Sequence, residues 1–88
     1  MVHRNITIHG RVQGVFFRHH MRLLAEELGI KGFIHNQPEG SIYIEAEGPE
    51  EGLEKLVNWS WEGPEMAEVD KVEIEEGDIK NFEDFRVR

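Results

Sequence analysis

The periodicity of apolar residues changes around the segment Gly10 to Arg18, which reads Gly-Arg-Val-Gln-Gly-Val-Phe-Phe-Arg. Before it, Val2 to His9 alternates loosely, with Ile6 and Ile8 on one face, as a half-buried strand does. After it, apolar residues recur at helical spacing, at Met21, Leu24, Ala25 and Leu28. The segment is therefore a turn that joins a strand to a helix.

The residue types in this turn are suited to binding an anion. Gly10 and Gly14 let the backbone pass close to a ligand and adopt positive φ. The first amides of a helix lack internal partners and attract anions, and Arg18 adds a planar fork that matches two phosphate oxygens. No Gly-Lys-Ser/Thr follows and a third glycine is missing, so the segment is neither a Walker A loop nor a dinucleotide fingerprint. The residues alone indicate a phosphate cradle, although a simple turn with a solvated arginine is the plainer alternative.

The rest of the chain continues to alternate between strand and helix. The first helix is expected over Phe17 to Leu28, with Gly29 as its terminator. A second helix is expected between Pro49, which suits a first helical position, and the Gly63-Pro64 stop. Further strands are expected at Lys31 to Asn36, Ser41 to Glu47, Val69 to Glu75 and Asp84 to Arg88, with a polar loop at Gly77 to Asn81.

Alternation within these strands also predicts which side chains face the core. The strongest alternation is in Ser41 to Glu47, and Val69 to Glu75 is read in the same way. The expected inward residues are Ile42, Ile44, Ala46, Val72 and Ile74, and the expected outward residues are Tyr43, Glu45 and Glu47. In the second helix the inner stripe is Leu53, Leu56, Val57 and either Ser60 or Trp61, and one of Trp59 and Trp61 is expected in the core.

The order β-α-β-β-α-β predicts an α+β fold. Two βαβ units with right-handed crossovers give a ferredoxin-like sandwich, with a four- to five-stranded antiparallel sheet and two helices on one face. Residues 1–88 are expected to form a single domain, because a chain of 88 residues has room for one modest core. This fold hosts many functions, so it does not decide the activity.

Composition limits the partners and the location. The net charge is −8, but residues 1–38 carry five basic side chains against two acidic ones, while residues 39–88 carry five against sixteen. An acidic protein with a local positive patch suits a small anionic ligand, so we expect no nucleic-acid partner. There is no membrane-spanning run, no signal peptide and no cysteine, which fits a cytoplasmic protein. A monomer is the default expectation at this size.

Asn36 is the candidate partner of the phosphate cradle, because the strand after the first helix returns beside it. An asparagine could hold a water near a phosphate without adding negative charge, whereas a carboxylate would repel the anion. The same residue also suits the start of the Asn-Gln-Pro-Glu-Gly turn, and the residues alone leave both readings open. The pairs His3 and His9, and His19 and His20, have spacings unsuited to a closed metal site, so no metal is expected.

Several segments together resemble the acylphosphatase family. The stretch Gly10 to Arg18 is similar to its phosphate-loop signature, which is long and specific. Further segments match the family in order and at similar spacing, and the resemblance covers essentially the whole chain. They are Ala25 to Gly29, Gly32 to Asn36, Gly40 to Gly48, Gly63-Pro64, Val69 to Val72 and Phe85 to Arg88.

The resemblance implies hydrolysis of acyl phosphates to a carboxylate and inorganic phosphate, without metal or cofactor. By motif position, Arg18 matches the substrate-binding arginine and Asn36 the asparagine that orients the attacking water. The expected phosphate cradle is formed by the backbone amides of Gln13, Gly14, Val15, Phe16, Phe17 and Arg18.

This sequence also departs from the family pattern, and two other functions remain open. Phe33 stands where tryptophan is frequent, and His35 where lysine or arginine is frequent. The roles of His19, His20 and His35 stay open. One alternative is a non-catalytic module that binds a phosphoryl or carbamoyl phosphate group. The other is an RNA-binding domain of the same topology, which needs exposed aromatic residues on a basic sheet.

Overall fold

Seven elements follow one another in the order that the periodicities predict. The structure, a computed structural model, describes all residues from 1 to 88. Its elements are β1 (Val2–Arg11), α1 (Phe17–Leu28), β2 (Lys31–Asn36), β3 (Ile42–Gly48), α2 (Glu50–Glu62), β4 (Glu68–Glu76) and β5 (Phe85–Val87). The bounds of α1 and β2 agree with the prediction, and Gly29 ends α1 in the left-handed conformation (φ 71°). Neither helix is long and apolar enough to cross a membrane.

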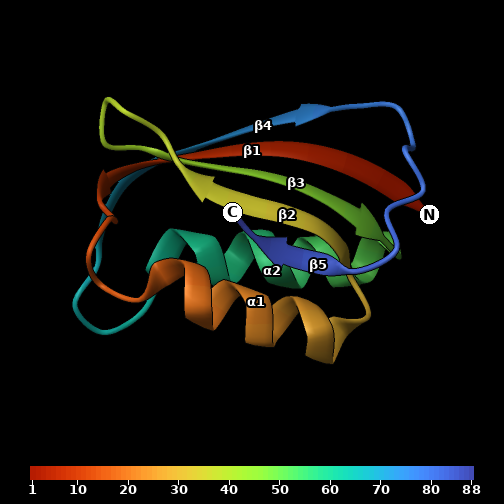
Figure 1. Ribbon diagram of the computed structural model, residues 1–88, viewed down its shortest axis with the longest axis horizontal. Coiled ribbons are helices and arrows are strands. Elements are labelled where there is room, and N and C mark those ends of the chain that lie inside the picture. The colour runs from red at the N-terminus through yellow and green to blue at the C-terminus, as the bar shows by residue number, and fades with distance from the viewer.

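The strands form one sheet in the order β4-β1-β3-β2-β5 (Figure 1). β1 pairs antiparallel with both β3 and β4, and β2 pairs antiparallel with β3. The expectation of a fully antiparallel sheet is wrong at one edge, because β5 runs parallel to β2. The segment after β4 crosses the end of the sheet at which β2 also begins, so β5 starts there and takes the same direction as β2.

Both helices cover one face of the sheet, as predicted, and the core lies between the two layers (Figure 1). Alternate strand residues point into it, as the period of two requires. The strands contribute Ile6, Ile8, Ile34, Ile42 and Ile44, and the helices contribute Phe17, Met21, Ala25, Leu53 and Leu56. Each large side chain buried in this way stabilises the fold by about 1.5–3 kcal/mol.

Two open points on the helix side are decided by packing. α2 buries Ser60, whose hydroxyl donates to the carbonyl of Leu56 (2.8 Å), and leaves Trp61 51% exposed. Trp59 is the tryptophan that packs against the core, edge-on to the ring of Phe17.

One residue predicted in the core lies mostly outside it. Ile74 is 44% exposed, because β4 is an edge strand.

The outer face of the sheet departs most from the sequence-based expectation. Glu45 and Glu47 point to this face, yet they are only 8% and 2% exposed. The segment between β4 and β5 lies over them, and the backbone amides of Lys80 and Phe82 in it donate to the Glu47 carboxylate. The polar loop predicted at Gly77 to Asn81 is therefore a cover over one end of the sheet.

Candidate active site

A β-bulge near the end of β1 precedes the loop that joins β1 to α1. The register of β1 against β4 shifts between His9 and Gly10. Gly10 has φ 128°, and a Cβ atom there would overlap the backbone of Glu68 in β4. Only glycine permits this close approach, so Gly10 turns the end of β1 toward the helix layer.

The side chains of this loop alternate between the core and the surface. Val15 and Phe17 are buried in the core, whereas Phe16 is exposed. Gly14 and Phe16 both have left-handed backbone, with φ of 75° and 64°. For a phenylalanine this conformation costs about 1–2 kcal/mol, a strain of the kind found at ligand-binding sites.

The backbone amides along this loop are free. Phe16 stands at the N-cap of α1 and makes no side-chain cap. The amides from Gly14 to His19 donate to no other group of the chain. Several N–H groups at a helix start therefore remain available, and they lie where the helix dipole favours an anion.

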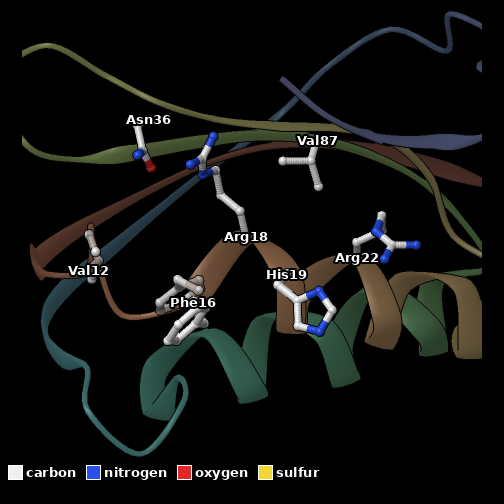
Figure 2. Close-up of a pocket in the computed structure, with 9 residues that line it drawn as sticks. Val12, Phe16, Arg18, His19, Arg22, Asn36 and Val87 are labelled. Atoms are coloured by element: carbon white, nitrogen blue, oxygen red, sulfur yellow. The ribbon is translucent and has the colours of Figure 1, made fainter.

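Arg18 lies in the first turn of α1 and reaches toward the sheet. Its Nη1 donates to the backbone oxygen of Arg88 (3.0 Å). Figure 2 shows its side chain rising from the helix toward the strands, with Asn36 close to its guanidinium group. The contact with Arg88 steadies one nitrogen of the fork, and the other donors stay free for a ligand.

Asn36 ends β2 and lines the same pocket as Arg18. Its Oδ1 is the one buried side-chain polar atom of the chain without a hydrogen-bond partner. The β2–β3 turn is closed by other groups, from Gln37 N to Ser41 O and from Gly40 N to Gln37 O. The Asn36 side chain is therefore not used by the turn, and a buried acceptor left in this way costs about 1–3 kcal/mol unless a water or ligand donates to it.

Gln13 connects the two halves of the site. Its Nε2 donates to the backbone oxygens of Gln37 (2.8 Å) and Ser41 (2.9 Å), in the turn that follows Asn36. The side chain thus holds the loop against the β2–β3 turn and does not line the pocket. In the same turn, the hydroxyl of Ser41 donates to Glu39 and holds the pKa of that carboxyl below its usual value.

The predicted residues are brought together at an open pocket of about 480 Å³. Of the six residues expected in the cradle, Gly14, Phe16, Phe17 and Arg18 line it, while Gln13 and Val15 support the loop from behind. Sequence reasoning did not assign the other lining residues, which are Val12, His19, Arg22 and Val87. The i, i+4 spacing of Arg18 and Arg22 was the signal that could have identified Arg22.

The charge of the pocket suits an anion. Arg18 and Arg22 line it, and no carboxylate does. His20 is not among its residues, and His35 stacks on Phe33 with ring centroids 5.8 Å apart. No group of three or more side chains in the chain is arranged to hold a metal ion.

Comparison with known proteins gives one family over nearly the whole chain. A family model for acylphosphatase matches residues 4–87. An acylphosphatase from Archaeoglobus fulgidus is 44% identical over 87 residues, covering 99% of this chain and 98% of that protein. The structure of an acylphosphatase from Coxiella burnetii has a TM-score of 0.96 at 40% identity, covering 99% of this chain and 92% of that one. The crystal structure of an acylphosphatase from Bacillus subtilis has a TM-score of 0.97 at 29% identity and covers 100% of this chain and 99% of that one. The chain therefore belongs to the acylphosphatase family, and the expected hydrolase activity on acyl phosphates is confirmed.

Proposed function

We propose that the β1–α1 loop and Arg18 bind the phosphoryl group of an acyl phosphate, and that Asn36 positions the water that hydrolyses it. The phosphoryl oxygens accept hydrogen bonds from the free amides of Gly14 to Arg18 and from the guanidinium of Arg18. The Oδ1 of Asn36 accepts a hydrogen bond from the attacking water. The observation that best supports this proposal is that Asn36 Oδ1 is buried without a hydrogen-bond partner in the pocket that Arg18 also lines.

The proposed reaction is an in-line displacement. The water oxygen bonds to phosphorus while the bond from phosphorus to the carboxyl oxygen breaks, and the carboxylate leaves with the electron pair. The water gives up its proton to solvent or to the phosphate product. Because a carboxylate is a good leaving group and the transition state is loose, positioning and charge stabilisation do most of the catalysis. No strong general base is required, which fits a pocket without a carboxylate.

The test is hydrolysis of acetyl phosphate by the wild type, Arg18→Ala and Asn36→Ala, with a chelator present. We expect each variant to lose about 2–4 kcal/mol of transition-state stabilisation, the scale of one oxyanion donor. Binding of inorganic phosphate should be lost in Arg18→Ala and kept in Asn36→Ala. Arg18→Lys should not restore the rate, because a point charge cannot reproduce the guanidinium fork.

Two control substitutions test whether a loss of turnover is specific to the pocket. Arg86→Ala removes an exposed arginine of β5 that does not line the pocket, and Asn58→Ala removes an asparagine of α2. Both should retain wild-type turnover. If Asn36→Ala turned over at the wild-type rate, the water-positioning role would be wrong. A wild type that bound phosphate without turnover would favour the binding-module reading, which the whole-chain acylphosphatase relatives do not favour.

We further propose that residues 1–88 act as a single domain, as a monomer in the cytoplasm, and without nucleic acid. The absence of cysteine from the sequence supports the location. Against RNA binding, the outer face of the sheet carries Glu73 and Glu75, and Phe33 is covered by the Arg88 guanidinium 4.0 Å from its ring centroid. Filter binding at low salt and sedimentation at several concentrations test these points, and retained RNA or a dimer would overturn them.

A further inference from the structure

The pocket has more room than a phosphoryl group needs. A water occupies roughly 30 Å³ of liquid, so a pocket of about 480 Å³ takes a ligand several times the size of one phosphoryl group. The groups proposed to hold the phosphate and the water are Arg18, Asn36 and the loop amides. Four lining residues, Val12, His19, Arg22 and Val87, remain available to the rest of the substrate.

In-line geometry indicates where the acyl part lies. The leaving carboxylate departs opposite the attacking water, which is placed at Asn36. Figure 2 shows Asn36 on one side of the Arg18 guanidinium and Val87 and Arg22 on the other, and all four line the same pocket. The acyl group is therefore directed along Val87 toward Arg22.

Arg22 can receive a second anion at that end. It follows Arg18 by one helical turn, which separates the two along α1 by about 6 Å. Its Nη1 donates to Glu26 (3.2 Å), and its other nitrogens have no partner in the chain. Since Glu26 is half exposed and does not line the pocket, this surface pair is weak and leaves the fork able to bind a ligand.

We propose that the pocket selects acyl phosphates whose short acyl chain ends in a second anionic group, with Arg22 as the specificity-determining residue. Val87 contacts the acyl chain, and Arg22 pairs with the terminal anion. This inference rests on the proposed function, because it assumes that the phosphoryl group lies at Arg18.

The test compares two rigid substrates of the same length, fumaroyl phosphate and crotonoyl phosphate. They differ in a terminal carboxylate against a methyl group, and the trans double bond keeps that carboxylate from attacking the acyl phosphate itself. For each enzyme form, kcat/KM is measured for both substrates. The ratio of a variant is then compared with that of the wild type, so that the intrinsic reactivities cancel.

We expect Arg22→Gln to lower the fumaroyl-to-crotonoyl ratio about tenfold, the effect of one charge-assisted hydrogen bond, with crotonoyl phosphate hydrolysis little changed. Arg22→Lys should keep part of the preference. Glu26→Gln should raise it, because it frees the Arg22 fork. Lys55→Gln is the matched control, since it removes one exposed positive charge from an i, i+4 pair on α2 and should leave the ratio unchanged.

The outcomes separate the two proposals. If Arg22→Gln leaves the ratio unchanged, or lowers both substrates equally, this inference is overturned while the proposed function stands. If Lys55→Gln lowers the ratio as much as Arg22→Gln, the effect is long-range charge and the subsite is also rejected. If the wild type hydrolyses neither substrate nor acetyl phosphate, the proposed function itself fails. Circular dichroism of each variant confirms folding, and the opposite effect expected for Glu26→Gln provides a test that does not depend on Arg22→Gln.

Discussion

The two ends of the sheet differ in whether their buried polar groups have hydrogen-bond partners. At the pocket end, Asn36 keeps a buried oxygen without a partner. At the other end, where β1 begins and β3 ends, His3 and Glu47 are almost completely buried and fully paired. An unpaired acceptor is a cost to stability that a bound water or ligand can relieve, whereas a paired network stabilises the fold only while it is complete.

The paired end is held by a short chain of contacts. His3 Nδ1 lies 2.7 Å from Glu47, and its Nε2 lies 2.9 Å from Asn5 Oδ1 and 3.2 Å from Glu45. Both ring nitrogens therefore lie within hydrogen-bond distance of oxygen atoms. Lys80 Nζ lies 2.7 Å from Glu45, so an ion pair adjoins the His3 contacts.

This network also connects the two ends. Glu47 accepts hydrogen bonds from the amides of Lys80 and Phe82, in the segment that leads into β5. β5 then brings Val87 to the pocket and leads to the Arg88 oxygen that contacts Arg18. The two ends therefore differ in one respect: the pocket end keeps a buried acceptor open to a ligand, whereas the other end pairs its buried polar groups within the chain.

The largest expected effect on stability comes from breaking the paired end. Glu47→Ala leaves His3 and two backbone amides without their acceptor, and removing one partner of a buried pair costs about 3–5 kcal/mol. Urea unfolding measures this loss. Glu47→Gln should cost less, and Glu75→Ala, on exposed β4, should change little. A loss below about 1 kcal/mol for Glu47→Ala would mean that the network does not stabilise the fold.

The second largest effect on stability is expected from acid, which should destabilise the network around Glu47. Burial alone raises the pKa of Glu47, but the Lys80 amide, the His3 ring and the Phe82 amide hold it below the ordinary value of 4.5. The pKa of Glu45 is also lowered, because hydrogen bonds from Lys80 and Tyr43 outweigh the effect of burial. The native state then binds fewer protons than the unfolded chain. The stabilisation is present above about pH 4.5 and is lost as the pH falls through the native pKa values.

Unfolding free energies measured from neutral pH down to pH about 3 check this slope. The slope should be shallower in Glu47→Gln, which has no carboxyl to protonate at this position. An equal slope in Glu47→Gln and the wild type would assign the acid sensitivity to other carboxylates.

A smaller effect on stability is expected at the contact between the β1–α1 loop and the β2–β3 turn. Gln13→Ala removes two hydrogen bonds to backbone oxygens, each worth about 0.5–1.5 kcal/mol. Because the link also positions the loop relative to Asn36, turnover of acetyl phosphate should fall as well. Gln37→Ala is the control, since its side chain bonds only to Ser41 Oγ within the turn. A fall in stability without any change in turnover would limit Gln13 to a structural role.

The smallest loss of stability is expected at the pocket end itself. Asn36→Ala deletes an unpaired buried oxygen that costs about 1–3 kcal/mol, so the unfolding free energy should not fall, although turnover falls strongly. Urea unfolding beside the acetyl phosphate assay checks both values on one preparation. A loss of stability near that of Glu47→Ala would remove the contrast between the two ends.

The local parts of this protein can be predicted from its amino-acid sequence. The bounds of α1 and β2, the Gly29 terminator and the helix layer follow from periodicity and terminator residues, which act over a few neighbouring positions. The loop amides and Arg18 could be predicted for the same reason, because they lie in one continuous segment. The partnership of Arg18 with Asn36 came from strand order and from the family resemblance, and the structure places both at one pocket.

The contacts between segments far apart in the chain depend on how the elements pack in three dimensions. The parallel direction of β5 depends on the end of the sheet that the segment after β4 crosses, and the burial of Glu45 and Glu47 depends on the same crossing. The Gln13 link to the β2–β3 turn and the place of Arg22 in the pocket depend on how α1 and that turn dock on the sheet. Alternation predicts the face of a strand on which a side chain lies, but not which distant segment covers that face.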